Sequence, residues 1–332
     1  MDDSHTLSSG KALFEGIIDR DTAALGRAIT LIESHRNEHL EKANSIIEKC
    51  LARKTDTIRV GITGVPGVGK STFIESLGEL LTALGHRVAV LAVDPTSTES
   101  KGSIMGDKTR MEKLVKNPNA FIRPSPSGTS LGGVSRKTRE SVILCEAAGY
   151  DIVLVETVGV GQSETTVHGM VDFFLLLKLS GAGDELQGIK RGIVEMADAV
   201  VINKADGENR KAAQAAAEEF KRALHLYPPK ENGWTPKVLT CSAQENEGIE
   251  DIWELITDYM ERSRTTGHFR QKRQRQNKNW LYEAIEQRLK SDFFQNKSIT
   301  AAIEESLPKV LAGTASPFRT AEELVGRFKN KS

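Results

Sequence analysis

The 332-residue sequence contains only three cysteines, Cys50, Cys145 and Cys241, and they are widely spaced. No two of them form a Cys-x-x-Cys pair, and none belongs to a Cys/His cluster of the kind that binds zinc. This distribution argues against a disulfide framework and against a structural metal site. We expect three reduced, buried thiols.

The sequence also lacks net charge and long apolar runs. Lys plus Arg and Asp plus Glu each number 45, so the basic excess typical of nucleic-acid-binding proteins is missing. The longest apolar run, residues 171–179, contains an aspartate and a lysine and is too short to span a bilayer. The first ten residues, MDDSHTLSSG, show no features of a signal or transit peptide. We expect a soluble cytoplasmic protein without nucleic-acid or membrane partners.

The hydrophobic pattern changes along the chain. Apolar residues recur at helical spacing through residues 11–55, with Asp21 and Thr22 as caps between two helices. From residue 58 onward, short runs rich in Val, Ile and Leu alternate with longer helical stretches: IRVGIT, RVAVLAVD, DIVLVET, FFLLLKLS, AVVINK and KVLTCSA. Such runs are typical of buried parallel strands. The pattern predicts an α/β fold with a doubly wound, mostly parallel sheet.

Three regions follow from this pattern. We predict an N-terminal helical segment (1–57), a nucleotide-binding α/β domain (58–265) and a C-terminal helical arm (266–332). The arm begins with a basic run, HFRQKRQRQNKNW, at residues 268–280. We favour a solvated helix face or linker for this run, with a dimerisation arm as the alternative and membrane or nucleic-acid contact third.

The strongest motif is Gly64-x-x-x-x-Gly69-Lys70-Ser71, which lies between a predicted strand and a predicted helix. In such a loop the backbone N–H groups point at phosphate oxygens, and the helix adds the positive end of its dipole. Lys70 would reach the β- and γ-phosphates, and Ser71 would bind Mg²⁺. The predicted phosphate site comprises Gly64, Val65, Pro66, Gly67, Val68, Gly69, Lys70, Ser71 and Thr72.

Carboxylates at the predicted strand ends suit a magnesium ion, which prefers oxygen ligands. Asp94 and Glu156 end two strands, and Asp107 lies in the polar loop between them, where an ordinary surface aspartate is an equal alternative. Together with Ser71 these three are the predicted Mg²⁺ ligands, and with Lys70 they are the predicted catalytic residues.

The stretch Glu156-Thr-Val-Gly159 is comparable to the DxxG of common GTPases, in which the glycine N–H senses the γ-phosphate. Ras-like proteins place a water-orienting glutamine directly after that glycine, whereas this sequence has Val160. A carboxylate acting through a bound water, Asp107 or Asp94, is the alternative, and we expect slow intrinsic hydrolysis.

The motif Asn203-Lys204-Ala205-Asp206 indicates which nucleotide base the protein recognises. Guanine presents two adjacent donors that one aspartate carboxylate can accept, and adenine does not, so Asp206 predicts GTP rather than ATP. The Lys204 stem can cover the base, and the Asn203 amide can bridge loops. Downstream, Ser242 and Ala243 complete the predicted site, with the Ala243 N–H as a donor to guanine O6; an ordinary strand exit is the alternative for this pair.

Taken together, GVPGVGKST, VDPTS, GDKTRM, VETVGVGQSE, LSGAGDELQGIKRG, NKAD and SAQENEGI closely resemble the MeaB/ArgK-type P-loop GTPases, over roughly residues 57–265. The resemblance implies a GTP hydrolase with GTP/GDP and Mg²⁺ as ligands. It implies a homodimer formed through terminal helices. It also implies a chaperone of an adenosylcobalamin-dependent acyl-CoA mutase, of which methylmalonyl-CoA mutase is the first candidate, acting in cofactor loading, protection or reactivation.

The same resemblance implies a further switch in the loop between Leu179 and Arg191 that reports the nucleotide state to the partner. Its candidate coupling residues are Asp184, Glu185, Gln187 and Lys190. From pattern alone an ordinary strand-to-helix connection fits this loop slightly better. Two other functions stay open: a nickel-type metal-insertion GTPase, which the dispersed histidines and cysteines disfavour, and a transport-associated protein kinase, for which no residue argues.

Overall fold

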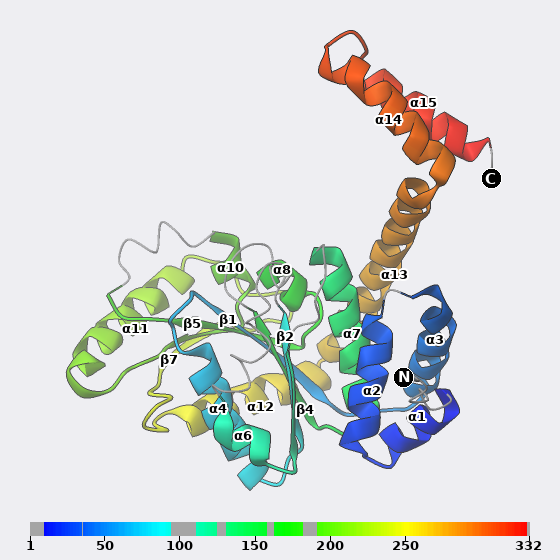
Figure 1. Cartoon of the computed structure of the whole chain (residues 1–332). Helices are drawn as coiled ribbons and strands as arrows, with labels where there is room; N and C mark the ends of the chain where they lie inside the picture. Colours follow the sequence, from blue (N-terminus) through cyan, green and yellow to red (C-terminus); the bar gives the residue numbers. More distant parts are fainter. Residues whose placement is uncertain are drawn as a thin grey trace. The chain divides into compact units, whose positions relative to one another are not determined.

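The structure is a computed structural model, and it describes residues 10–34, 36–93, 111–124, 131–157, 163–181 and 191–330. The chain divides into two compact units, with the boundary between Gln276 and Asn277. The first unit contains a sheet with helices on both faces, and the second consists of helices (Figure 1). In the described part of the chain, no helix combines the length and the apolar character that crossing a membrane requires.

The described strands form one seven-stranded sheet in the order β3-β2-β4-β1-β5-β6-β7, and all pairings are parallel. This confirms the predicted doubly wound α/β fold. The strands are β1 (Ile58–Gly64), β2 (Val88–Val93), β3 (Ala120–Arg123), β4 (Ile152–Thr157), β5 (Phe173–Lys178), β6 (Ala199–Ile202) and β7 (Lys237–Thr240). Strand β3 was not predicted, because it is a half-buried edge strand of only four residues and shows no apolar run.

The strand register brings the predicted motifs together. Residues 60–64 of β1 pair with 173–177 of β5, and residues 58–62 pair with 152–156 of β4. Because the strands are parallel, the residues that follow β1, β4, β5, β6 and β7 all lie at one edge of the sheet. The phosphate loop therefore leaves the central strand at the edge where doubly wound sheets bind ligands.

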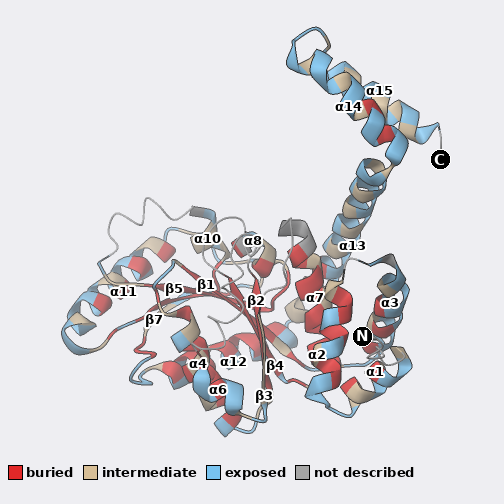
Figure 2. Ribbon diagram, viewed as in Figure 1, coloured by how far each residue is buried: buried red, intermediate tan, exposed pale blue. Residues whose placement is uncertain are grey.

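Helices cover both faces of the sheet (Figure 2). Leu175 and Leu177 of β5 pack in one hydrophobic cluster, whereas Leu176 packs in another on the opposite face. This alternation is the period-two pattern of a strand buried on both faces. One face carries α4 (Lys70–Ala83), α6 (Glu112–Lys116) and α12 (Ile249–Thr265); the other carries α7 (Leu131–Ala147), α8 (Ser163–His168), α10 (Arg191–Met196) and α11 (Arg210–Leu224).

Among residues 10–34 and 36–57, three helices precede the sheet: α1 (Gly10–Ile18), α2 (Thr22–Glu33) and α3 (Asn37–Leu51). Helices α2 and α3 pack against α7. Asp21 caps α2, since its carboxylate accepts a hydrogen bond from the Ala23 N–H at 2.8 Å. The helix buries Leu25, Ile29 and Ile32. The predicted helical N-terminal extension is therefore present.

Three helices follow α12: α13 (His268–Gln295), α14 (Lys297–Leu311) and α15 (Pro317–Lys329). The boundary between the two compact units falls within α13. Asn296 and Ser316 cap α14 and α15 with their side chains. In the second unit, the rings of Phe293 and Phe328 meet edge to face with their centroids 5.3 Å apart.

Candidate functional site

The predicted phosphate loop connects β1 directly to α4. Gly64 ends β1 and Lys70 begins α4, so the intervening backbone curls at the N-terminus of that helix. A Cβ atom at Gly64 would lie 2.6 Å from the Leu177 carbonyl oxygen, and one at Gly69 would lie 2.8 Å from Asn203 Nδ2. Gly69 also has a φ of 92°. Glycine at both positions avoids these close contacts, and a glycine-rich loop at the N-terminus of a helix is typical of phosphate-binding sites.

Lys70 lies within this loop. Its Nζ donates hydrogen bonds to the Gly64 carbonyl at 2.9 Å and to the Val65 carbonyl at 3.2 Å, and the residue is buried. The ammonium group is thus held above the carboxyl end of the central strand. A phosphate chain in the loop would meet this charge directly, in surroundings where a charge–charge contact is stronger than in water.

Ser71 and Glu156 come together next to the loop. Ser71 Oγ lies 3.4 Å from Glu156 Oε1, and Glu156 is buried at the end of β4. The adjacent residue, Thr157, donates to Thr63 on β1 at 2.8 Å and so fixes the two strand ends to each other. A hydroxyl and a carboxylate oxygen in this position fit the hard-oxygen preference of Mg²⁺. The other two predicted ligands, Asp94 and Asp107, lie outside the described residues, as does Gly159.

Asn203 connects three parts of the site. Its Nδ2 donates to the Val68 carbonyl of the phosphate loop at 2.9 Å, and its backbone N–H donates to the Lys178 carbonyl at the end of β5. Its Oδ1 accepts from the Ala243 N–H at 3.2 Å and from the Cys241 thiol at 3.3 Å. The Ala243 N–H, predicted to donate to guanine O6, is thus engaged by Asn203 in this structure.

Asp206 of the base motif is held by a residue that follows β7. Asp206 accepts a hydrogen bond from Ser242 Oγ at 2.5 Å, and Ser242 exchanges backbone hydrogen bonds with Glu247. Lys204 is exposed and has a φ of 60°, which is unusual for a non-glycine residue. The structure therefore brings together every described residue of the predicted phosphate and base motifs.

Sequence reasoning missed several residues that support this arrangement. Cys241 is buried, and burial raises its pKa to about 12, so the protonated thiol serves as a donor to Asn203. Arg210 at the start of α11 forms an ion pair at 2.6 Å with Glu247 of the turn after β7. Asn209 bonds to the Lys204 carbonyl. The Cys241 and Arg210 contacts join segments 38 and 37 residues apart, whereas Asn209 lies five residues from Lys204. Only the position of Asn209 next to the motif was a possible signal.

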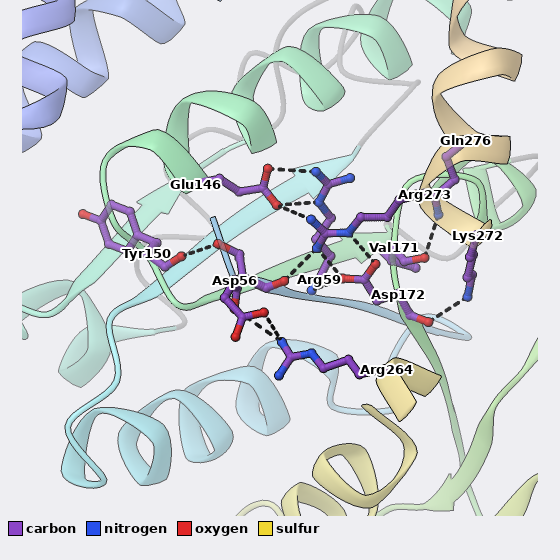
Figure 3. A network of polar contacts seen from close by, with 11 residues as sticks. Asp56, Arg59, Glu146, Tyr150, Val171, Asp172, Arg264, Lys272, Arg273 and Gln276 are labelled. Carbon is purple, nitrogen blue, oxygen red and sulfur yellow. Dashed lines mark hydrogen bonds and ion pairs between the residues drawn. The ribbon is translucent and has the colours of Figure 1, made fainter. Parts of the chain in front are cut away.

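The basic run at the start of α13 is only in part the solvated helix face or linker that we predicted, since residues 270, 271, 274, 275 and 277–279 are exposed. Three of its residues, Lys272, Arg273 and Gln276, contact the turn at Val171 and Asp172 that precedes β5 (Figure 3). These contacts are buried or partly buried, so this part of the run is not a solvated helix face or a free linker. This part of the run was misread because its counter-charges lie about 100 residues earlier in the chain.

The centre of this network is Asp172, whose side chain is 2% exposed. Arg273 donates to its two carboxylate oxygens at 2.9 and 2.7 Å, and the Arg59 backbone N–H donates at 2.9 Å. Burial alone would raise the pKa of Asp172, but Arg273 and Arg59 outweigh it and the pKa is lowered. Arg59 in turn forms a two-point ion pair with Glu146 of α7 at 2.7 and 2.8 Å. The network thus ties the first residues of α13, up to Gln276, to the amino end of the sheet, away from the nucleotide motifs.

A second buried carboxylate, Asp198, lies before β6. Lys230 contacts it at 2.7 Å and Lys272 at 3.9 Å, and together they outweigh burial and lower its pKa. Nearby, burial lowers the pKa of His168 to about 4, with help from the charge of Lys272, so the imidazole is neutral at pH 7. The predicted switch residues Asp184, Glu185, Gln187 and Lys190 lie outside the described residues.

Comparison with known proteins identifies the family. The sequence model of the family described as "Methylmalonyl Co-A mutase-associated GTPase MeaB" matches residues 25–298. The protein named "Probable GTPase Rv1496" of Mycobacterium tuberculosis is 47% identical over 322 residues, covering 97% of this chain and 96% of that protein. The mitochondrial methylmalonic aciduria type A homolog of Mus musculus is 45% identical over 329 residues, covering 96% and 79%.

A solved structure shows the same arrangement of elements. The crystal structure of a protein titled LAO/AO transport system kinase has a TM-score of 0.76 and 37% identity, and the match covers 98% of this chain and 99% of that one. The family match and the two sequence relatives agree with the motifs at the carboxyl edge of the sheet. The chain therefore belongs to the family of methylmalonyl-CoA mutase-associated GTPases of the MeaB type, and it is a GTP hydrolase.

Proposed function

We propose that this GTPase is a chaperone of an adenosylcobalamin-dependent acyl-CoA mutase, with methylmalonyl-CoA mutase as the first candidate. In this proposal GTP hydrolysis is coupled to loading, protection or reactivation of the mutase. The observation that carries it is the family match over residues 25–298, because the description of the family names association with that mutase. The mouse relative, named for methylmalonic aciduria, adds support.

At the phosphates, the backbone N–H groups of the loop 64–72, Pro66 excepted, would act as donors at the start of α4, and Lys70 would bind the β- and γ-phosphate oxygens. Ser71 and Glu156, whose oxygens lie 3.4 Å apart, would hold Mg²⁺ together with Asp94 and Asp107. Mg²⁺ held by these residues would supply positive charge next to the phosphate oxygens. One of the two aspartates orients the attacking water, and Lys70 stabilises the transition state by its fixed charge.

At the base, Asp206 accepts hydrogen bonds from the two guanine donors, Lys204 covers the ring and Asn203 joins the base motif to the phosphate loop. Ser242 Oγ already donates to Asp206 and orients its carboxylate. Asp206→Asn should weaken GTP binding and improve binding of xanthosine triphosphate, because the amide donates to the xanthine C2 carbonyl. Competition binding with GTP, ATP and XTP measures this. An unchanged ranking would remove Asp206 from the base site.

The chaperone role has a direct test. Phosphate release is measured for the purified GTPase alone and with saturating methylmalonyl-CoA mutase, isobutyryl-CoA mutase or an unrelated acyl-CoA enzyme. We expect slow intrinsic turnover and stimulation by one of the two adenosylcobalamin-dependent mutases only. Equal turnover in all mixtures, together with the absence of a complex in size-exclusion chromatography, would refute the proposal.

Kinase activity is a second candidate, because the similar solved structure is titled a transport system kinase. A kinase transfers the γ-phosphate to a protein hydroxyl or other acceptor, whereas a hydrolase transfers it to water. Incubation with γ-labelled GTP and cell extract distinguishes the two outcomes. Label found only in free phosphate supports the hydrolase, and stable label on one protein, lost in Lys70→Ala, supports the kinase.

We also propose that the protein forms a homodimer in which the C-terminal arm, residues 266–332, takes part. Several large apolar side chains of its helices are exposed, including Leu281, Leu289 and Phe318. Sedimentation of the full chain and of a Leu281→Glu, Leu289→Glu variant would test this, with a dimer expected only for the unaltered chain. The cytoplasmic location stays a prediction.

A further inference from the structure

Asn209 occupies an unusual position next to the base motif. It is the last residue of the short 3₁₀ helix Gly207–Asn209 and directly precedes α11. An asparagine that precedes a helix ordinarily accepts a hydrogen bond from an N–H of the first turn, but the Asn209 side chain makes no such bond. Its Nδ2 instead donates to the Lys204 carbonyl at 2.5 Å, and its Oδ1 accepts from Ser180 Oγ at 2.5 Å. Instead of capping α11, the Asn209 side chain forms two hydrogen bonds with residues that follow β5 and β6 at the carboxyl end of the sheet.

The first of these contacts bears on the backbone of Lys204. This residue has a φ of 60°, a left-handed conformation that a residue with a side chain adopts at a cost. Its neighbours are fixed, since the Asn203 N–H donates to the Lys178 carbonyl and the Ala205 N–H donates to the Cys241 carbonyl. The Lys204 carbonyl lies between these fixed points, and the Asn209 amide holds it. The position of the exposed lysine stem follows from this backbone conformation.

The second contact joins the motif to strand β5. Ser180 lies two residues after the end of β5, and its hydroxyl donates to Asn209 Oδ1. The phosphate loop approaches the same region, because a Cβ at Gly69 would lie 3.9 Å from Lys204 Cε. The Asn209 amide therefore links the base motif to the chain that follows β5. The Lys204 side chain lies close to the phosphate loop.

We propose that Asn209 is a positioning residue of the guanine site. It holds the Lys204 backbone in its left-handed conformation, and so places the aliphatic stem of Lys204 against the guanine ring. This inference rests on the proposed assignment of Asn203–Asp206 as the base site. Asn209 itself does not contact the nucleotide and acts through Lys204.

The test is the dissociation rate of a fluorescent GDP from the full-length protein, followed by displacement with excess GDP. Asn209→Ala removes both contacts and should speed dissociation by about 3–10-fold, which is the range for one net hydrogen bond. Asn209→Asp keeps an acceptor for Ser180 but cannot donate to the Lys204 carbonyl. GDP should therefore dissociate from Asn209→Asp at least as fast as from Asn209→Ala. Ser180→Ala leaves the Lys204 contact and should stay within about twofold of the unaltered protein.

A matched control is Asn117→Ala. Asn117 likewise uses its amide in two hydrogen bonds, because its Nδ2 donates to Thr82 Oγ1 and its Oδ1 accepts from the Asn119 N–H. It precedes β3, however, which is the outer strand at the opposite side of the sheet from β7. This variant should leave GDP dissociation unchanged. A melting temperature for every variant identifies general loss of stability, which would affect Asn117→Ala as well.

The decisive measurement is the same substitution in a Lys204→Gly background. Glycine adopts a positive φ without cost, and no lysine stem remains to be placed. If Asn209 acts through Lys204, the further effect of Asn209→Ala on dissociation should fall below about twofold, a non-additive result. An unchanged 3–10-fold effect in that background, or no effect in either, overturns the inference.

The competition assay with Asp206→Asn separates this inference from the proposed site. If Asp206→Asn shifts preference towards XTP while Asn209→Ala leaves dissociation unchanged, the guanine site stands and the role of Asn209 falls. If Asp206→Asn leaves the nucleotide ranking unchanged, the base site itself is misassigned and the inference falls with it.

Discussion

Replacing Arg273 by alanine is expected to lower the free energy of unfolding of the first compact unit by about 3–5 kcal/mol, the range for removing one partner of a buried ion pair. Arg273 makes two hydrogen bonds to the Asp172 carboxylate and a third to the Thr57 carbonyl at 2.7 Å. Without it, Asp172 stays buried as an anion that keeps the Arg59 N–H as a donor but has lost its guanidinium. The loss is a large share of the 5–15 kcal/mol that usually stabilises a domain.

The expected loss depends on pH in a defined direction. In the native protein the folded-state pKa of Asp172 is lowered from its ordinary value of 3.8. The ion pair therefore stabilises the fold above that value, and its contribution disappears as the pH falls through the folded-state pKa. In Arg273→Ala the guanidinium that lowers this pKa is missing, so the pKa of Asp172 should be higher than in the unaltered protein. The deficit relative to the unaltered protein should then shrink as the pH falls, because protonation removes the uncompensated charge.

Urea unfolding followed by tryptophan fluorescence measures this loss, since Trp234 and Trp253 are buried in the first unit. Arg275→Ala is the matched control. Arg275 lies two residues further along the same helix and pairs with Glu231 at 2.8 Å, but the pair is exposed and should contribute little. If Arg273→Ala and Arg275→Ala unfold at the same urea concentration, or if the Arg273→Ala deficit grows towards pH 5, the buried network does not hold α13 as described.

Three further outcomes are expected. Lys70→Ala should reduce GTP hydrolysis at least about 100-fold with an unchanged circular dichroism spectrum, because the lost charge acts locally on the phosphates; wild-type phosphate release would contradict this role. Gly61→Ala should destabilise the fold by about 1–3 kcal/mol, since its Cβ would lie 2.9 Å from side-chain atoms of Phe174, Val167 and Val171; an unchanged thermal midpoint would show that α8 adjusts freely. Neutralising Asp184, Glu185 or Lys190 should leave intrinsic turnover within a few-fold of wild type but weaken stimulation by the mutase; full stimulation in all variants would move the switch to the segment after Glu156.

The local motifs were predictable because their chemistry depends on residues close together in the chain. The loop from Gly64 to Ser71 needs a strand before it and a helix after it, and both are visible as hydrophobic patterns. The base motif needs only the right four residues after a strand. The parallel sheet followed from six runs rich in Val, Ile and Leu, whereas β3 was missed because four half-buried residues leave no such pattern.

The sequence by itself was enough for the fold class and the family, both of which are confirmed, and it predicted the phosphate loop and the guanine motif. Only the tertiary structure showed which distant groups pair inside the protein: Cys241 with Asn203, Arg59 with Glu146, and Arg273 with Asp172. The last two pairs are separated by 87 and 101 residues. A charged side chain looks the same in sequence whether it faces water or a buried partner. The difference arises only when packing removes water from both charges, which makes their pairing strong and its loss costly.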